Sequence, residues 1–191
     1  MKVGLISDAH GHLANLESVV NALDRKVDRF VFAGDAFSEY KFSNEVVALL
    51  RQKQVDYILG NHEQSFLSDL GQRARQSPGV DQELVQYVRE RPQTMRMCFD
   101  GTRVLVVHAS PWPPYTQYLV PGSRELSRCS ELECDVLVLG HSHSAFVLET
   151  STTVVVNPGS AGVPSAEGEV SGAILDTSSR SVAHVRVPAS S

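Results

Sequence analysis

Several features that would assign a protein to a class by composition alone are missing from this chain of 191 residues. It has only three cysteines, Cys98, Cys129 and Cys134, and no Cys-x-x-Cys pair. A disulfide framework is therefore not expected, and a reduced, cytoplasmic protein is favoured. No apolar run approaches the ~20 residues of a membrane span, and the apolar stretch after Met1 is too short for a secretory signal. We therefore expect a soluble protein with no membrane partner.

Positive charge is also scarce, because 17 Lys and Arg residues face 22 Asp and Glu residues. Without a basic tract, extensive nucleic-acid binding is not expected. No Gly-x-Gly-x-x-Gly motif follows the first predicted strand, which argues against dinucleotide binding. Internal repeats and low-complexity segments are absent as well. A chain of this length that is 42% hydrophobic predicts a single domain over residues 1–191.

The N-terminal part of the sequence alternates between strand-like and helix-like patterns. Short apolar runs at residues 2–6, 30–33 and 55–59 predict strands. Between them, apolar residues recur at helical spacing from Leu13 to Val27, and Ser43 can cap a helix that runs through Leu50. This order of elements predicts a parallel sheet with right-handed crossovers.

The rest of the chain is richer in strand patterns. Asp81 can cap a helix that Pro92 stops, and Asp100-Gly101 is typical of a type I′ hairpin between residues 95–99 and 103–107. We expect this half to continue as an antiparallel meander. Its further strands are predicted at residues 136–139, 145–148, 153–156, 172–175 and 181–187. Residues 110–124, rich in proline and aromatic residues, form the one long irregular loop.

Six of the seven histidines lie in or beside short motifs that follow predicted strands. These motifs are Asp8-Ala9-His10-Gly11-His12, Gly34-Asp35, Gly60-Asn61-His62-Glu63, His108 and Gly140-His141-Ser142-His143. Ligands of open α/β sheets gather at the carboxyl ends of the strands, so five strand ends direct polar groups to one edge. Each motif alone reads as an ordinary turn. Together, their imidazole, carboxylate and amide groups favour a site for two transition-metal ions.

These motifs, in this order and followed by Asn157-Pro158-Gly159-Ser160, resemble the calcineurin-like metallophosphoesterases. The length and the order of elements look most like the small, single-domain bacterial and archaeal phosphodiesterases of that superfamily. The resemblance extends from Lys2 to about Asp176. It implies an α/β fold in which two mixed β-sheets pack as a sandwich flanked by helices.

The resemblance also implies a centre for two metal ions. One ion would be held by Asp8, His10 and His143, the other by Asn61, His108 and His141, and the Asp35 carboxylate would bridge both. Such a donor set suits Mn, Fe, Zn or Ni better than Mg, and Mn is the ion we expect. A hydroxide shared by the ions would be the nucleophile. Two divalent ions, two carboxylates and one hydroxide leave a net charge of about +1, which would attract a phosphate.

His62 is expected to be catalytic, together with Asp35 and Asn61, and not to be a metal ligand. It would donate a proton to the leaving oxygen or stabilise the transition state. The alternative is a loop histidine bonded to Glu63 or to a carbonyl group. Glu63 stands where the family usually has Asp, a change expected to alter how His62 is oriented.

Three further residues are candidates for binding the substrate. His12 either lines the pocket or caps the helix that begins at Leu13. Trp112 and Tyr115 either stack on an organic group of the substrate or form an apolar plug over the core. By contrast, the turn at residues 157–160 is expected to be structural, and His184 is expected to face solvent.

Other enzyme classes fit the sequence less well. Haloacid-dehalogenase phosphatases need a second Asp where this chain has His10, and amidohydrolases use a barrel of ~250 residues. The Asp35 motif also lacks the arginine that follows it in phosphoprotein phosphatases, which disfavours a phosphoprotein substrate. The resemblance implies a phosphodiesterase. The sequence does not name its substrate, and a cyclic nucleotide, a dinucleoside polyphosphate and another small phosphoester all stay open.

Two alternatives within the same fold are kept: a phosphomonoesterase, and a non-catalytic interaction scaffold. The retromer subunit that resembles these enzymes has lost the catalytic histidine, whereas this chain keeps His62. The oligomeric state is left open, and a homo-oligomer is one option.

Overall fold

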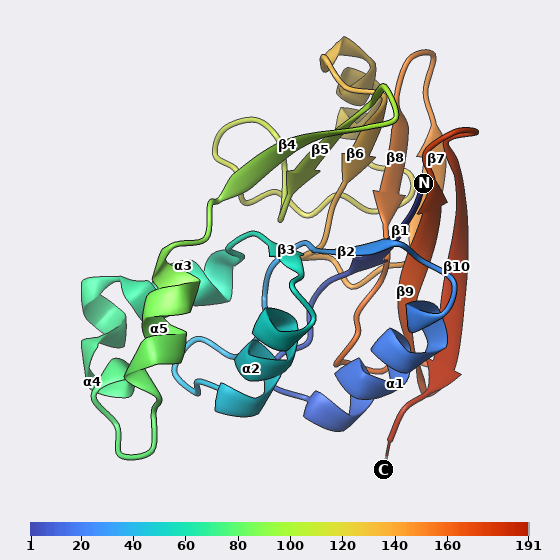
Figure 1. Cartoon of the computed structure of the whole chain (residues 1–191). Helices are drawn as coiled ribbons and strands as arrows, with labels where there is room; N and C mark the ends of the chain where they lie inside the picture. The colour runs from blue at the N-terminus through green and yellow to red at the C-terminus, as the bar shows by residue number, and fades with distance from the viewer. Residues whose placement is uncertain (191) are drawn as a thin grey trace.

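Two five-stranded β-sheets form the centre of the computed structural model, which describes residues 1–190 (Figure 1). The first sheet has the strand order β10-β9-β1-β2-β3, and the second has the order β4-β5-β6-β8-β7. Both sheets contain parallel and antiparallel pairs. This arrangement confirms the predicted class of two mixed sheets flanked by helices. The strands are β1 (Lys2–Ile6), β2 (Arg29–Phe32), β3 (Asp56–Tyr57), β4 (Thr94–Phe99), β5 (Thr102–Val107), β6 (Val136–Val138), β7 (Phe146–Glu149), β8 (Val154–Asn157), β9 (Glu169–Asp176) and β10 (Ser181–Pro188).

The first sheet contains the predicted parallel unit. Strands β1, β2 and β3 run parallel, and helices α1 (Leu13–Asp24) and α2 (Asn44–Gln52) connect them. As expected, Ser43 caps α2 by accepting a hydrogen bond from the Val46 backbone N–H. Two elements are shorter than predicted: α1 ends before Val27, and β3 has only two residues.

The second half of the chain is not the antiparallel meander that the pattern predicts. The hairpin of β4 and β5 is present, with Asp100 at φ 50° and Gly101 at φ 86°, as a type I′ turn requires. However, β6 pairs in parallel with both β5 and β8. The 28 residues between β5 and β6 provide a long crossover, which parallel pairing needs and a hairpin turn does not. Strands β9 and β10 join the first sheet instead.

The remaining helices cover the end of the molecule next to β3 (Figure 1). They are α3 (Asn61–Leu67), η1 (Asp69–Gly71), α4 (Gln72–Arg75) and α5 (Gln82–Arg89). A 3-10 helix, η2 (Arg124–Glu131), lies in the crossover between β5 and β6. The predicted α5 begins after Asp81, whose carboxylate accepts hydrogen bonds from Glu83 and Leu84. No helix of the described residues is long and apolar enough to cross a membrane.

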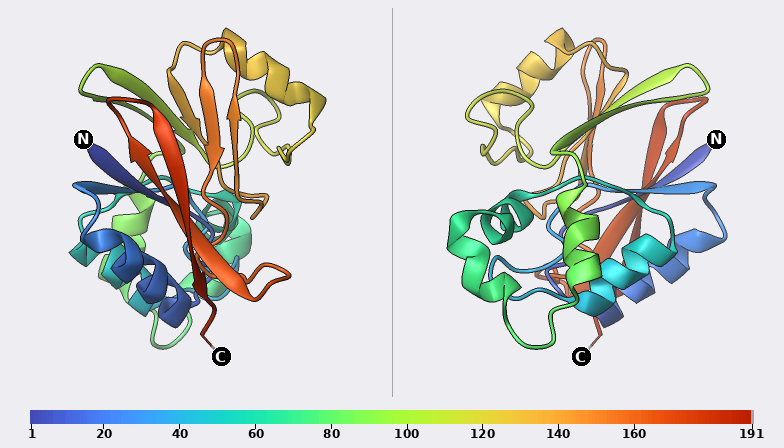
Figure 2. Two further views of the ribbon diagram at one scale, coloured as in Figure 1. Left: turned by 90° about the vertical axis from the view of Figure 1, so that its right-hand side faces the viewer. Right: turned by 60° about the vertical axis from the view of Figure 1, so that its left-hand side comes forward.

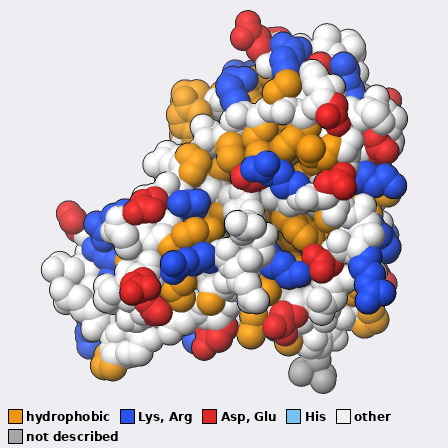
Figure 3. Space-filling view, viewed as in Figure 1, with side chains coloured by type: hydrophobic (Ala, Val, Ile, Leu, Met, Phe, Trp, Pro, Cys, Tyr) orange, Lys and Arg blue, Asp and Glu red, His pale blue; other side chains and the backbone are white. Residues whose placement is uncertain are grey.

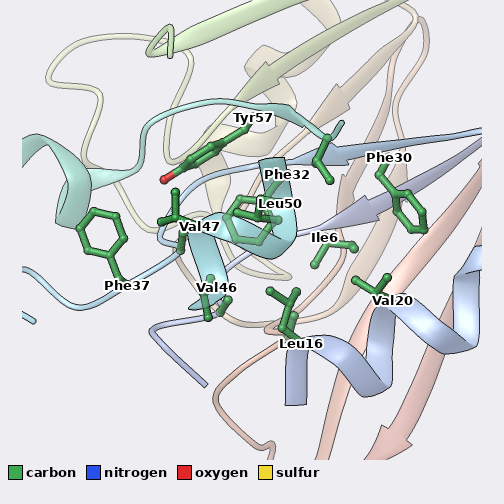
Figure 4. Close-up of a cluster of buried hydrophobic side chains, with 14 of the residues drawn as sticks. Ile6, Leu16, Val20, Phe30, Phe32, Phe37, Val46, Val47, Leu50 and Tyr57 are labelled. Atoms are coloured by element: carbon green, nitrogen blue, oxygen red, sulfur yellow. The ribbon is translucent and has the colours of Figure 1, made fainter. Parts of the chain in front are cut away.

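Three apolar clusters hold these layers together. The first lies between the helices and one face of the first sheet, where Ile6 and Phe32 meet Leu16, Val46 and Leu50 (Figure 4). The second lies between the two sheets, and the third lies on the far face of the second sheet under the long loop and η2. The side views show the resulting order of helices, first sheet, second sheet and outer loop (Figure 2). The sandwich is thus covered on both sides.

Charged side chains of both signs are interspersed on the face that Figure 3 shows, with apolar side chains between them. That face has no broad basic surface.

Candidate metal centre

The motifs that follow the strands meet at one place because their loops bond to one another. The Asp8 N–H donates to the carbonyl of Gly34 at 3.0 Å, and the His10 N–H donates to that of Asp35 at 3.0 Å. On the side of the second sheet, the Gly140 N–H donates to the carbonyl of His108 at 2.9 Å. The His141 N–H donates to the Asp8 carboxylate and links the two sides at 3.1 Å. The loops therefore form one connected framework.

Most candidate ligands have an unusual backbone conformation. Five of the seven have positive φ, at 56° for Asp8, 47° for His10, 61° for Asp35, 64° for His141 and 54° for His143. Such a conformation costs a non-glycine residue about 1 kcal/mol or more, and it persists only where surrounding structure enforces it. The chain turns sharply at each of these residues and directs their side chains toward a common point. Clustering of this kind is typical of functional sites.

One group of candidate ligands consists of Asp8, His10 and His143. The Nε2 atoms of the two histidines lie 3.0 Å apart, and His143 Nε2 is 3.3 Å from Asp8 Oδ1. His10 Nε2 lies 3.8 Å from Asp8 Oδ1. One ligand atom from each residue lies within 4.8 Å of the others. This spacing is compact enough for one ion.

A second group consists of Asn61, His108 and His141 together with Asp35. His108 Nε2 lies 3.1 Å from Asp35 Oδ2 and 3.0 Å from Asn61 Oδ1. His141 Nε2 is buried and has no hydrogen-bond partner among the described residues. Buried polar atoms are rarely left without a partner, so this nitrogen is suited to bind a metal ion.

Asp35 stands between the two groups. Its Oδ2 atom is 3.1 Å from His108 Nε2 on one side and 3.9 Å from His10 Nε2 on the other. The structure thus brings together all seven predicted ligands, and Asp35 lies between the two groups. Four imidazoles, two carboxylates and one amide fit two divalent transition-metal ions.

Histidines compensate the two buried carboxylates. Among the described residues, Asp8 and Asp35 have no ion-pair partners other than histidines. Burial alone would raise the pKa of Asp8, but hydrogen bonds from His10 and His143 hold it well below its usual range. Burial likewise opposes the charge on His108, but Asp35 outweighs this effect and raises the pKa of His108 to about 9. A metal ion that binds here near neutral pH must displace that proton.

His141 differs from His108 in its electrostatics. Burial is the main cause that lowers the pKa of His141, and the charge on His108 lowers it further. Its imidazole is therefore neutral near neutral pH, which is the form that binds metals. The ring is held by Tyr118, which stacks on it with a centroid distance of 3.9 Å and an interplanar angle of 27°. Nothing in the local sequence pattern around Tyr118 indicates this contact.

His62 lies beside the two groups with a different bonding pattern. Its backbone N–H donates to Asp35 Oδ1 at 3.0 Å, and its Nδ1 accepts a hydrogen bond from the Glu39 N–H at 3.0 Å. A neutral imidazole that accepts at Nδ1 carries its proton on Nε2. This Nε2 lies 3.7 Å from Asp35 Oδ2, and the ring is 4.8 Å from that of His10. His62 therefore offers a donor, not a lone pair, to the centre.

Glu63 does not bond to His62, because its carboxylate is directed to other groups. It is fully buried, and its carboxylate accepts hydrogen bonds from the backbone N–H groups of Asp35, Ala36 and Gly60 at 2.9, 2.6 and 2.7 Å. The Tyr57 hydroxyl donates a fourth, at 2.9 Å. Burial and the charge on Asp35 raise the pKa of Glu63 to about 7. Glu63 thus fixes the loops that carry Asp35 and Asn61.

The structure separates the three candidates for substrate binding. His12 is exposed and lines a cavity beside His10. It also occupies the N-cap position of α1, as the second alternative expects, although its side chain makes no capping hydrogen bond. Trp112 is buried and its Nε1 donates to Gln117 Oε1 at 2.6 Å. The Arg128 guanidinium covers its ring at 4.3 Å, so Trp112 is a plug and not a stacking surface. Tyr115, in contrast, is 60% exposed.

Two further expectations concern the turn at residues 157–160 and His184. The Asn157 amide donates to the carbonyl of Gly140, and the Ser160 hydroxyl donates to that of Asp8, both at 2.7 Å. The turn thus supports two of the ligand loops. The prediction for His184 is wrong, because its side chain is half-buried and its Nε2 bonds to the Asn157 carbonyl at 2.8 Å.

Comparison with known proteins adds a family to this geometry. A family model described as a calcineurin-like phosphoesterase superfamily domain matches residues 1–180. No curated protein matches the sequence significantly.

Several solved structures share the fold over nearly the whole chain. A metallophosphoesterase from Sphaerobacter thermophilus is 24% identical with a TM-score of 0.75, over 98% of this chain and 88% of its own. The hypothetical protein PH1004 from Pyrococcus horikoshii OT3 is 18% identical with a TM-score of 0.82, and the match covers 99% of this chain and 88% of PH1004. An archaeal phosphodiesterase is 21% identical with a TM-score of 0.65, and the match covers 98% of this chain and 100% of that enzyme. At these identities the likeness shows the shared fold.

Proposed function

Because the chain belongs to the calcineurin-like phosphoesterase superfamily, we propose that it is a phosphohydrolase that uses two divalent metal ions. The observation that carries this proposal is the position of Asp35 between two groups of ligand-type side chains. The buried, unpartnered Nε2 of His141 supports it independently. Manganese is the ion proposed, with iron, zinc and nickel as the alternatives that the donor set allows.

The residues of the centre divide into ligands and one hydrogen-bond donor. Two bound ions would act as Lewis acids on a phosphoryl group and lower the pKa of water. Asp8, His10 and His143 would hold one ion, and Asn61, His108 and His141 the other, with Asp35 shared. His108 is set for this task because its Nδ1 bonds to the Ala33 carbonyl at 2.7 Å, which leaves Nε2 to face the centre.

His62 is proposed to stabilise the transition state with its Nε2–H. The Glu39 N–H donates to His62 Nδ1. A proton added to Nδ1 would therefore point at the Glu39 N–H, which is itself a donor. Full transfer of the Nε2 proton would therefore leave an unfavourable imidazole anion. A hydrogen bond to a phosphoryl oxygen, on which negative charge develops, does not have this cost. The bonding of His62 thus favours stabilisation over proton donation.

We propose a small phosphodiester as the substrate. The structural likeness to an archaeal phosphodiesterase supports a diester, and the absence of an arginine shortly after Asp35 disfavours a phosphoprotein. A phosphomonoesterase is the alternative within the same chemistry. A non-catalytic scaffold is the alternative outside it, but the retention of His62 beside every candidate ligand favours an enzyme.

Hydrolysis of bis-p-nitrophenyl phosphate tests the function. Protein stripped of metal and reloaded with manganese should release nitrophenol, and p-nitrophenyl phosphate should react more slowly. His62→Ala should lower kcat by about 10²- to 10³-fold, as the loss of a transition-state donor does. Asp35→Asn should reduce both metal binding and activity. As a control, His184→Ala removes the histidine outside the centre and should keep its activity. An inert reloaded protein would contradict the proposal.

A further inference from the structure

A cavity of about 570 Å³ opens beside the second group of candidate ligands. Asn61, His108 and His141 form part of its wall. From there it extends to Arg96 on β4 and to Tyr115 in the long loop. Its volume lies within the range of about 300–1,000 Å³ that is usual for small-molecule sites. A molecule bound at the metal centre can therefore continue into this space.

The cavity is lined by a cation, Arg96, that pairs with no carboxylate of residues 1–190. Arg96 is exposed and forms no ion pair among the described residues; its guanidinium reaches only the Glu133 carbonyl, at 3.5 Å. No Asp or Glu side chain lines the cavity. The uncompensated guanidinium is therefore available to an anionic group of a ligand.

Two other cavities also touch candidate ligands, and their charge differs. The one beside His143 is lined by Glu167 and Glu169 as well as by Arg186, and the one beside His10 is lined by Glu45 as well as by Lys41. Carboxylates in both would repel or compete with a second anion. Of these three cavities, the one with Arg96 suits an anionic group best.

Arg96 is held away from a phosphate at the centre, because its guanidinium contacts the Glu133 carbonyl, which precedes β6, whereas His108 follows the parallel strand β5. In the register of the hairpin it is paired with Leu105, which precedes His108 by three residues. At about 3.3 Å per residue, this places Arg96 roughly 10 Å from His108 along the strand direction. A backbone separation of this order leaves room for a group such as a nucleoside between two phosphates. The same cavity is lined by the exposed aromatic ring of Tyr115 and by the amide groups of Gln64 and Gln93.

We propose that this cavity binds one ester group of the substrate, about the size of a nucleoside, and that Arg96 holds a second phosphate on that group. The planar fork of the guanidinium suits two hydrogen bonds to a phosphate. The exposed face of Tyr115 suits a base. The assignment of this group to a substrate rests on the proposed phosphohydrolase function, but its binding needs no turnover.

A pair of chromogenic diesters tests the cavity. Thymidine 3′-phosphate 5′-(p-nitrophenyl phosphate) carries the second phosphate, and thymidine 5′-(p-nitrophenyl phosphate) lacks it. The first should have a kcat/KM about tenfold higher, mainly through KM. Arg96→Ala should abolish this difference, Arg96→Lys should keep part of it, and neither should change the rate with bis-p-nitrophenyl phosphate. Equal kcat/KM values for the two diesters in the unchanged protein would overturn the proposal.

Tyr115 has its own signature in the same assay. Tyr115→Ala should lower kcat/KM for both thymidine diesters, whereas Tyr115→Phe should preserve it. Methyl p-nitrophenyl phosphate, whose second ester group is a methyl group that cannot stack, should lose less of its kcat/KM in Tyr115→Ala than either thymidine diester. A loss that is equal for all three substrates would assign Tyr115 to the catalytic centre and not to the cavity.

A binding measurement distinguishes failure of the cavity from failure of the proposed function. In the presence of manganese, thymidine 3′,5′-bisphosphate should bind about tenfold more tightly than thymidine 5′-phosphate by calorimetry. Arg96→Ala should remove the difference. If the protein hydrolyses no ester yet shows this pattern, only the proposed function fails. If it hydrolyses bis-p-nitrophenyl phosphate but binds both nucleotides equally, only the cavity proposal fails.

Discussion

In their neutral forms, two histidines of the centre carry their protons on opposite ring nitrogens. His108 bonds through Nδ1 to the Ala33 carbonyl, so its neutral form presents the lone pair of Nε2. His62 accepts at Nδ1 from the Glu39 N–H, so its neutral form presents an N–H at Nε2. One imidazole is thereby prepared to bind a metal and the other to donate a hydrogen bond. Both tautomers are set by backbone groups.

Tyr118 provides a prediction at the scale of one residue. Its ring stacks on His141 and limits the orientations of that imidazole. A stacked aromatic pair contributes about 0.5–1.5 kcal/mol, so Tyr118→Ala should weaken the binding of one manganese ion about two- to tenfold. Tyr118→Phe keeps the ring and should bind both ions as the unchanged protein does. Calorimetric titration of metal-free protein with manganese measures the affinity for each ion. If Tyr118→Ala binds both ions as tightly as the unchanged protein does, Tyr118 does not have this role.

The ligand candidates could be predicted from the sequence, whereas their supporting residues could not. Each candidate directly follows an apolar run, so its position at a strand end is visible in the pattern. Glu39, Tyr57 and Tyr118 act through contacts with segments distant in sequence or within loops. No periodicity or motif marks such contacts. The contacts of Glu63 could not be predicted for the same reason, since its partners include backbone N–H groups of another loop.

The loops between strands and helices determine where the ligands stand. The loop after β2 and the loop before α3 approach so closely that a side chain at Gly60 would lie 2.1 Å from Asp35 Oδ1 and 2.6 Å from Asp35 N. Glu63 holds the same two loops together from the buried side. The spacing of these loops therefore fixes the place of the bridging carboxylate.

Gly60→Ala tests this arrangement at the scale of the loop. The added methyl group should displace Asp35, lower stability by about 1–3 kcal/mol through overpacking, and reduce the bound manganese below two ions per chain. Gly101→Ala is the control, because Gly101 also has a demanding backbone, at φ 86°, but open space around it. It should lose about 1 kcal/mol of stability and keep both ions. Full occupancy in Gly60→Ala would show that Asp35 does not depend on this contact.

At the same scale, the existence of most strands could be predicted but not all their partners. The hairpin of β4 and β5 follows from Asp100-Gly101, whose turn is local. The parallel pairing of β6 with β5 depends on the path of residues 108–135, which contain no regular pattern from which a direction could be read. The pairing of β9 with β1 joins segments that are far apart in the chain. Local patterns carry no information on such distant pairings.

At the scale of the whole molecule, the candidate centre lies where the two sheets meet. Asp8, His10, Asp35 and Asn61 come from loops of the first sheet, and His108, His141 and His143 come from loops of the second. Neither sheet supplies enough ligands for two ions. The sandwich itself, held by the apolar cluster between the sheets, therefore assembles the centre, and two ions would link its halves.

The most direct test of the two-ion centre is anomalous X-ray scattering from crystals of the protein reloaded with manganese. Two manganese peaks should appear about 3.5–4 Å apart, the usual spacing of paired catalytic ions. The Asp35 carboxylate should lie between them, with three of the other six ligands around each. A single peak, or peaks remote from Asp35, would contradict the proposed centre.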